Sequence, residues 1–308
     1  MSSPLYLIDA SIYIFRYYFG LPENWHSQEG HPTQAVYGYL KFLLSLIDKE
    51  SPEYIAVAFD ESLGNCFRNQ IYPAYKANRV LPDEALAFQL NACVEVTGML
   101  GITGLASDTH EADDIMGTLA KRGRQVNGHQ IIVVSRDKDL MQLVGPNDLI
   151  WDYGQAEPQD RMAVMGRMGV WPEQLADYLA LVGDSIDNIP GVPGIGAKTA
   201  AALLKHFGSL NALLQAGELI GEVPVRGAKN LSAKIDAYRE QILMARKLTK
   251  IAEDAPVGHV DMNPGPNREL KRQPIALDDL AAFCQRMGLG GYLLSKAERL
   301  VDGVEDTP

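Results

Sequence analysis

The sequence predicts an α/β fold built on a parallel sheet, and two observations support this class. Through the first half of the chain, short apolar runs of strand length alternate with amphipathic stretches of helical length, which is typical of strand–helix–strand units. Three of the apolar runs end at an aspartate, and the carboxyl ends of parallel strands meet at one edge of a sheet. The hydrophobic content of 46% and charged content of 22% are those of an ordinary globular protein.

Four strands are predicted in the N-terminal half, with helices between them. The strands cover residues 5–8, 54–59, 130–134 and 148–151, and the helices cover 33–49, 83–99, 112–123 and 138–144. From about Trp171 the pattern changes to short helices broken by Gly and Pro, at residues 173–182, 197–206, 209–215 and 232–248. A proline-rich connector from Val257 to Pro274 precedes a last helical pair, at residues 277–287 and 290–300, and an acidic tail.

A chain of 308 residues exceeds the usual size of one hydrophobic core, so we expect more than one part. We predict an α/β core over residues 1–170, a helical module over 171–250 and a C-terminal helical extension over 251–308. No run approaches the roughly 20 apolar residues of a membrane span, and the first residues lack a secretory signal pattern. The three cysteines show no paired spacing, which fits a reducing compartment, so we expect a cytoplasmic monomer without a membrane partner.

Four aspartates follow predicted strands and are candidates for one shared site. Asp9 ends the first strand, Asp60 follows the second, and Asp137 and Asp139 follow the third. In open parallel sheets, ligands bind beyond the carboxyl ends of the strands, so these side chains would converge on one edge. The alternative is that aspartate simply favours strand ends and turns.

A second group of acids lies at the start of the predicted helix 112–123. Glu111, Asp113 and Asp114 fall within four residues, before the apolar run IMGTLA. One acid there would be explained as a helix cap, but three so close repel one another, and no Lys or Arg lies within reach in the sequence. A divalent cation is the better explanation, and all-oxygen ligands favour Mg²⁺ or Mn²⁺. The number of acids predicts two ions, roughly 3.5–4 Å apart, that clamp a phosphodiester and activate water.

A basic and aromatic stretch, residues 61–79, follows the second strand. Its cations Arg68, Lys76 and Arg79 alternate with Phe67, Tyr72 and Tyr75, and no acid follows Glu61. Cations interleaved with stacking aromatics suit a nucleic-acid strand that passes an active site. The alternative is a surface loop whose aromatic rings pack into the core.

The stretch GDSIDNIPGVPGIGAKT, residues 183–199, resembles a nucleotide-binding P-loop but departs from it twice. Ala197 separates Gly196 from Lys198, and an apolar helical run rather than a strand precedes the loop. A helix, a Gly-x-Gly turn and an Ala-rich helix instead form a helix–hairpin–helix pattern, which presents backbone N–H groups to a DNA phosphate. Asp184 and Asp187, in the same loop, could join the other acids. A plain helical hairpin with capping acids is the alternative.

These motifs occur in a familiar order. LIDAS, AFDE, FRNQIYPAYKANR, EADD, SRDKDLMQLV and GDSIDNIPGVPGIGAKTA resemble the motifs of bacterial 5′→3′ exonucleases, the flap-endonuclease family that includes the N-terminal domain of DNA polymerase I. The ending AFCQRMGLGGYLLSKAERL resembles the closing helices of that family, so the resemblance covers nearly the whole chain. It implies a PIN-like nuclease core with a helical arch near residues 61–95, and a helix-three-turn-helix DNA-binding module.

The resemblance also implies roles for individual residues. The acids that would hold two divalent ions are Asp9, Asp60, Glu111, Asp113 and Asp114 for one ion, and Asp137, Asp139, Asp184 and Asp187 for the other, with some shared. Lys76 and Arg79 would be the catalytic cations that steer the scissile phosphate, and Tyr75 would stack on a base near the cut. Arg68, Tyr72, Gly194, Gly196, Lys198 and Thr199 would contact DNA. The carbonyl groups of Gly194, Ile195 and Gly196 would hold a K⁺ ion that bridges to the duplex.

Two positions depart from the family pattern. Ala10 stands where a glycine is common, and Arg136 stands beside the DKD motif where a small residue is common. Neither change removes an acid. The formal net charge of −11 argues against a nucleic-acid partner at first, but it falls to −2 without the nine acids of the cluster, and two divalent ions would more than neutralise the remainder.

The sequence therefore predicts a structure-specific enzyme that hydrolyses DNA phosphodiester bonds from 5′ ends and at 5′ flaps, in replication or repair. A PIN-type endoribonuclease and a DNA-structure binding protein without catalysis are the alternatives. The complete set of acids speaks against the second. The initial Met and acidic ending favour a stand-alone protein over part of a longer polymerase.

Overall fold

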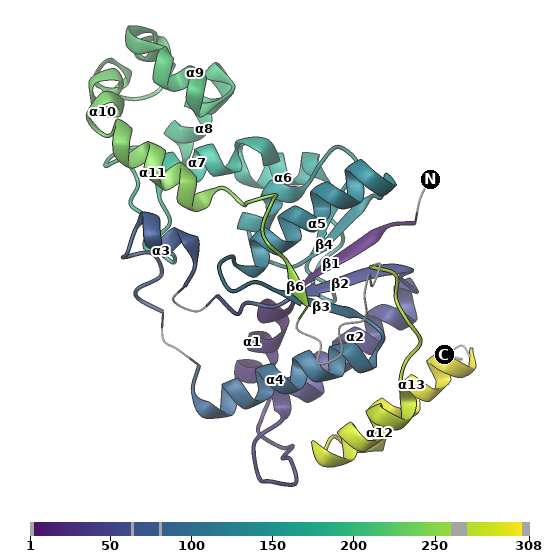
Figure 1. Cartoon of the computed structure of the whole chain (residues 1–308). Helices are drawn as coiled ribbons and strands as arrows, with labels where there is room; N and C mark the ends of the chain where they lie inside the picture. The colour runs from purple at the N-terminus through teal and green to yellow at the C-terminus, as the bar shows by residue number, and fades with distance from the viewer. Residues whose placement is uncertain (1–2, 63–64, 80–81, 260–269, 304–308) are drawn as a thin grey trace.

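A central sheet organises the fold. Figure 1 shows the computed structural model, which describes residues 3–62, 65–79, 82–259 and 270–303. Within these residues, six strands lie in the order β5–β4–β1–β2–β3–β6, and all neighbours are parallel except β6, which is antiparallel to β3. The strands are β1 (Leu5–Asp9), β2 (Tyr54–Ala58), β3 (Thr103–Ala106), β4 (Ile131–Val134), β5 (Leu149–Trp151) and β6 (Gly258–His259). This arrangement confirms the predicted α/β class with a parallel sheet.

Helices bury both faces of the sheet. Leu5 and Leu7 of β1 belong to one buried cluster, whereas Tyr6 and Ile8 belong to the other, because successive side chains point to opposite faces. Helix α5 (Ala112–Asn127) covers the first face. The second face is covered by α1 (Ala10–Gly20), α2 (Gln34–Glu50), α4 (Glu84–Met99), α12 (Leu277–Arg286) and α13 (Gly291–Asp302). Two covered faces explain why the strands are apolar along their whole length.

The helical module follows β5 and lies above the sheet in Figure 1. It contains α6 (Arg161–Met168), α7 (Leu175–Val182), α8 (Ala197–Phe207), α9 (Leu210–Gln215), α10 (Leu231–Ala237) and α11 (Arg239–Thr249). Short 3₁₀ turns, η2 (Pro172–Gln174), η3 (Gly217–Glu222) and η4 (Ala228–Asn230), connect them.

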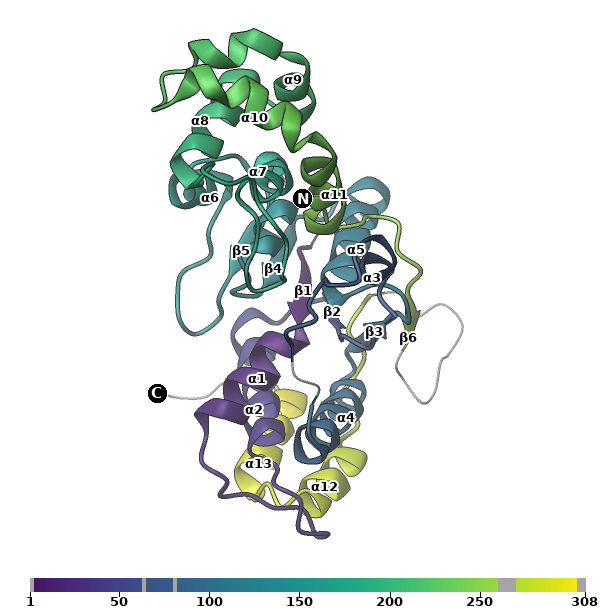
Figure 2. The same ribbon diagram turned by 90° about the vertical axis from the view of Figure 1, so that its left-hand side faces the viewer.

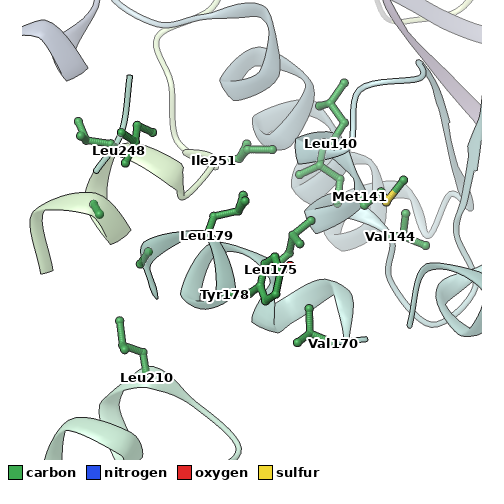
Figure 3. Close-up of a cluster of buried hydrophobic side chains, with 14 of the residues drawn as sticks. Leu140, Met141, Val144, Val170, Leu175, Tyr178, Leu179, Leu210, Leu248 and Ile251 are labelled. Carbon is green, nitrogen blue, oxygen red and sulfur yellow. The ribbon is translucent and has the colours of Figure 1, made fainter. Parts of the chain in front are cut away.

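A shared apolar cluster fixes the helical module to the α/β core. Figure 3 shows Leu140 and Met141, from the 3₁₀ turn η1 (Asp139–Leu143) that follows β4, beside Leu175 and Leu179 of α7. All four side chains are buried in the same cluster as the α5 face of the sheet. Burial of each such side chain contributes roughly 1.5–3 kcal/mol, so the contact between η1 and α7 is a stable one. Since η1 begins at Asp139, this contact also fixes the position of the acids after β4 relative to the module.

The C-terminal segment belongs to the core rather than to a separate extension. Strand β6 extends the sheet at β3, and the backbone N–H groups of Arg272 and Gln273 donate to the carbonyls of Glu53 and Gly101. Helices α12 and α13 then bury Phe283 and Leu293 against α2 and α4. Part of the predicted connector, residues 260–269, and the acidic tail, 304–308, lie outside the described residues.

Several elements differ from the sequence-based expectation. Helices α1 and α6 and strand β3 were not predicted, because α1 is rich in aromatic and β-branched residues and the TGLA run of β3 has few. The helix expected at 138–144 is the 3₁₀ turn η1, and the one expected at 232–248 breaks at Tyr238 between α10 and α11. No helix in the described part of the chain is long and apolar enough to cross a membrane.

Candidate active site

The predicted acids gather at the carboxyl ends of the strands. Asp9 ends β1, Asp60 lies two residues after β2, and Asp137 and Asp139 follow β4. The pKa of Asp9 is raised to about 7, chiefly by burial and also by the charges of Asp137 and Asp60, although the hydrogen bond from Ser135 lowers it. Parallel topology therefore brings together acids that are separated by more than a hundred residues in the chain.

Asp113 and Asp139 are the most poorly compensated members of this cluster. Burial, together with the charges of Asp137 and Asp9, raises the pKa of Asp113 well above its usual range. Burial and Asp137 raise the pKa of Asp139 to about 7 although Lys138 lowers it. The Oδ1 atom of Asp139 is buried and accepts no hydrogen bond from any described residue. Partly buried carboxylates in this state call for a nearby cation.

Ser135 links two of the acids and was not among the predicted site residues. Its Oγ donates a hydrogen bond to Asp9 Oδ2 at 2.9 Å and accepts one from the N–H of Asp137 at 3.0 Å. The N–H of Asp139 in turn donates to Asp137 Oδ1 at 2.9 Å. The turn after β4 therefore holds three side chains in fixed positions. The position of Ser135, directly after a strand and before the DKD motif, was the signal that could have found it.

Lys76 reaches into the acid cluster from the segment between β2 and α4. Its Nζ lies 2.5 Å from Glu111 Oε1 and 3.8 Å from Asp187 Oδ2, and Arg79 lies 2.8 Å from Asp187 Oδ1. Burial raises the pKa of Glu111, but Lys76 and Arg68 lower it by more, so the net shift is downward. The two predicted catalytic cations and these two predicted acids are thus brought together.

The loop before α8 also reaches the cluster. Asp184 is buried and pairs with Lys138 Nζ at 2.6 Å, a contact that the sequence analysis missed although Lys138 stands between two of its candidate acids. The N–H of Lys76, a residue with the left-handed φ of 52°, donates to the carbonyl of Asp187 at 3.0 Å. Asn188 Nδ2 donates to the carbonyl of Ala74 at 2.7 Å. The basic segment is therefore docked on the loop that carries Asp184 and Asp187.

Asp114 and Arg68 correct two predictions. Asp114 is fully buried, and its two oxygens accept from the Arg68 guanidinium at 2.6 and 2.8 Å and from the backbone N–H groups of Ala252 and Glu111. Arg68, in helix α3 (Phe67–Ile71), is only 2% exposed. Asp114 has no oxygen left for a metal ion, and Arg68 cannot reach DNA. Both residues instead anchor α3 to the first turn of α5.

The two tyrosines of the basic segment differ in exposure. Tyr75 is 4% exposed, and its hydroxyl donates to Glu111 Oε2 at 2.8 Å, so its ring is not open to a nucleic-acid base in this arrangement. Tyr72 is partly exposed. The packing of Tyr75 corresponds to the alternative of aromatic rings that turn into the core.

The acid cluster fits a hard divalent cation in its chemistry. Among the described residues, no group of three or more Asp, Glu, His or Cys side chains already converges as a finished metal site. Glu111, Asp184 and Asp187 point their oxygens at lysine and arginine partners. The remaining donors are carboxylate oxygens, which Mg²⁺ and Mn²⁺ prefer. The buried and unpartnered Oδ1 of Asp139 is the oxygen that most clearly lacks a cation.

The glycine turn of the module is exposed at the start of α8. Gly194 has the left-handed φ of 80°, Gly196 caps α8, and Lys198 in the first turn is exposed whereas Thr199 is half-buried. Ile195 is buried and holds the turn by donating its N–H to Val192. The free N–H groups of a helix N-terminus are suited to a phosphate.

One cation near this turn was not predicted. Lys234 Nζ donates to the carbonyl of Pro193 at 2.8 Å, directly beside the carbonyl groups expected to hold K⁺. An ammonium group in that place can bind the same kind of oxygen ligand as a potassium ion. The sequence gives no sign of this contact, because α10 lies about forty residues further along the chain.

Comparisons with known proteins agree with this arrangement. The family model described as the 5′-3′ exonuclease N-terminal resolvase-like domain matches residues 4–169, and the model of the C-terminal SAM fold of the same family matches residues 170–269. A 5′-3′ exonuclease of Buchnera aphidicola is 36% identical over 255 residues, which cover 82% of this chain and 88% of the relative. DNA polymerase I of Pseudomonas aeruginosa is 38% identical over 271 residues, but the chain spans only 29% of its length.

Solved structures share the fold at lower identity. T5 5′-exonuclease with bound divalent metal ions (zinc) has a TM-score of 0.65 at 19% identity and covers 98% of this chain and 100% of its own. Flap endonuclease-1 from Methanococcus jannaschii has a TM-score of 0.60 at 12% identity and covers 98% of this chain and 92% of its own. The chain therefore shares its fold with nucleases that include a flap endonuclease. The chain belongs to the 5′→3′ exonuclease family.

Proposed function

We propose that the chain hydrolyses phosphodiester bonds of DNA at 5′ ends and 5′ flaps, with two divalent ions held by the acid cluster. The observation that carries this proposal is the group of buried and half-buried, poorly compensated carboxylates at the carboxyl ends of β1 and β4, with the unpartnered Oδ1 of Asp139 among them. The residues that would hold Mg²⁺ or Mn²⁺ are Asp9, Asp60, Glu111 and Asp113 on one side and Asp137, Asp139, Asp184 and Asp187 on the other. When bound, such ions activate water and stabilise the leaving 3′-oxygen.

Lys76 and Arg79 would offset the charge of the phosphate that is cut. In the structure both cations pair with acids, so binding of the ions and the DNA strand must exchange these partners. A phosphate that replaces Glu111 and Asp187 as the partner of Lys76 is also an anion. The ammonium group is therefore not left without a counter-charge by the exchange. The docking of residues 74–79 on the loop of Asp187 would open in the same step.

The module would hold the duplex away from the cut. Gly194, Gly196, Lys198 and Thr199 present a helix N-terminus and one ammonium group, which suits a sequence-independent contact with backbone phosphates. A K⁺ ion at the carbonyl groups of this turn remains part of the proposal, with Lys234 as its competitor. Structural relatives crystallised with DNA, among them T5 D15 flap endonuclease and the Rad2 catalytic core, support DNA as the partner. We place this activity in the cytoplasm, in replication or repair.

A cleavage assay tests the proposal. A 5′-labelled flap DNA is incubated with the wild-type chain in Mg²⁺ or in EDTA, and a single-stranded RNA of equal length serves as the competing substrate. We expect Mg²⁺-dependent products at and near the flap junction and little RNA cleavage. Efficient RNA cleavage would instead favour a PIN-type endoribonuclease, and tight flap binding without products in Mg²⁺ or Mn²⁺ would leave a DNA-binding protein without catalysis.

A further inference from the structure

A cavity of about 340 Å³ lies beside the acid cluster, at the carboxyl ends of β4 and β5. Ser135 lines it and also bonds to Asp9, so the cavity and the acid cluster share a side chain. Arg136, from the turn after β4, and Arg167, from the last turn of α6, bring two guanidinium groups into the lining from separate elements. None of the roles assigned above uses these two arginines.

These arginines differ from the other cations of the site in having no partner. Lys76, Arg79 and Lys138 each pair with a carboxylate of the cluster. The side chains of Arg136 and Arg167 make no ion pair or hydrogen bond with any residue that the structure describes. Both are exposed to solvent, so they are free to bind a ligand without first breaking a contact.

The acids of the lining do not cancel this charge. Asp152 is already paired with Arg16, whose Nη2 lies 2.5 Å from its Oδ1. Glu157 is the other carboxylate, and it lies on the exposed loop between β5 and α6. Since Arg16, which lies outside the lining, neutralises Asp152, the two arginines of the lining face one unpaired carboxylate, which leaves an excess of one positive charge. The cavity therefore favours an anion.

We propose that Arg136 and Arg167 form a phosphate subsite, which holds a phosphate of the substrate strand next to the bond that is cut. This inference rests on the proposed nuclease function. Guanidinium groups bind phosphate through paired hydrogen bonds and do so more strongly than an ammonium group. The cavity volume lies at the lower end of the range of ligand pockets, roughly 300–1,000 Å³, and is large enough for a phosphate with its sugar. Met141 and Ile150 provide apolar lining for the sugar.

The position in the sheet explains what such a subsite adds. In Figure 2, β4 and β5 lie on one side of β1, and β2 and β3 lie on the other. Lys76 and Arg79 form ion pairs with Glu111 and Asp187 of the acid cluster, whereas Arg136 lies in the turn after β4. A strand that crosses the cluster would then meet cations on both sides.

Equilibrium binding without cleavage tests the subsite. The Kd of a labelled 5′-flap DNA is measured by fluorescence anisotropy in Ca²⁺ over a series of salt concentrations for the wild type, Arg136→Ala, Arg167→Ala and the double variant. Arg122→Ala, which removes an exposed arginine of α5, is the control for net charge. We expect each single variant to weaken binding about tenfold, as for a lost charge-assisted hydrogen bond. The double variant should bind the flap more weakly than the wild type by clearly less than a hundredfold, because both arginines hold one phosphate. The slope of its log Kd against log salt concentration should fall by about one.

Two forms of the substrate distinguish the source of the phosphate. If the arginine variants bind more weakly only to DNA with a 5′-phosphate, and not to DNA with a 5′-hydroxyl, the subsite holds the terminal phosphate monoester. If binding to both forms is weakened equally, the subsite holds an internal phosphodiester. The subsite is refuted if both single variants bind like Arg122→Ala, or if their effects are fully additive. A wild type that binds the flap but fails to cut it in Mg²⁺ would refute the proposed function and leave this binding result intact.

Discussion

Asp113 and Asp114 are adjacent in the first turn of α5 and meet opposite environments. Asp114 is enclosed by the guanidinium of Arg68 and two backbone N–H groups, so every oxygen has a donor. Asp113 faces Asp9 and Asp137 instead, and burial with these charges raises its pKa. Because successive residues of a helix point about 100° apart, one carboxylate faces the core and the other faces the acid cluster. Acids that form one motif in the sequence therefore divide into a structural pair and a site for chemistry.

Removal of the unpaired acid should give the largest effect on activity. We expect Asp113→Asn to lower kcat/KM for flap cleavage by at least about a thousandfold, since charge stabilisation at such a site contributes several kcal/mol. In EDTA the same variant should gain about 0.5–2 kcal/mol in free energy of unfolding, because an uncompensated buried charge is removed. Asp108→Asn, an exposed neighbour, is the matched control. Loss of stability in EDTA would show that Asp113 is structural after all.

Removal of the paired acid should instead act on stability. Asp114→Ala removes the carboxylate that accepts two hydrogen bonds from the buried Arg68 and leaves that guanidinium only one ion pair, a 3.4 Å contact with Glu111. It should lower the free energy of unfolding by about 3–5 kcal/mol in urea denaturation. Glu173→Ala, which breaks the exposed pair with Arg161, should change it by less than about 1 kcal/mol. If the two variants unfold alike, the division between the two acids is wrong.

The parallel sheet is the part of the site that the sequence could predict. Asp9 and Asp137 end separate apolar strands, and parallel strands present their carboxyl ends at one edge whatever lies between them. The partners of the acids could not be predicted in the same way. Arg68 and Lys138 meet Asp114 and Asp184 only after the chain has folded, because α3 and the loop before α8 are placed by tertiary packing.

The same distinction applies to the rest of the fold. The strands with continuous apolar sequence were predicted close to their observed bounds, whereas the TGLA strand β3 was missed because its composition carries little signal and its neighbours β2 and β6 decide its structure. The C-terminal helices α12 and α13 were predicted as helices but not as part of the core. Their partners, α2 and α4, lie about two hundred residues earlier, and periodicity indicates only which face is apolar, not what covers it.

Lys76 combines both kinds of role, because it pairs with Glu111 in the structure and is proposed to contact the phosphate that is cut. We expect Lys76→Ala to lower kcat about a hundredfold, as for other groups that stabilise developing charge. It should also lower the Mg²⁺ concentration needed for half-maximal activity, because Glu111 loses its competing partner. Lys41→Ala on α2 is the control, and a rise in the Mg²⁺ requirement would contradict competition.

The smallest effect is expected at the module, which would bind backbone phosphate by one turn and one exposed cation. Lys198→Ala should weaken duplex binding severalfold and reduce the slope of log Kd against log salt by about 0.9, which corresponds to one phosphate contact. Lys205→Ala, at the other end of α8, should leave the slope unchanged. Equal slopes for the two variants would remove the glycine turn from the proposed DNA contact.

The central claim is that the acids of the cluster, and not Asp114 with its partner Arg68, hold divalent ions. Binding of Mn²⁺, followed by electron paramagnetic resonance of the free ion, measures this directly without DNA or catalysis. We expect two ions per wild-type chain, fewer or much weaker sites in Asp113→Asn and Asp139→Asn, and two in the control Asp108→Asn. Unchanged stoichiometry and affinity in both cluster variants would contradict the account.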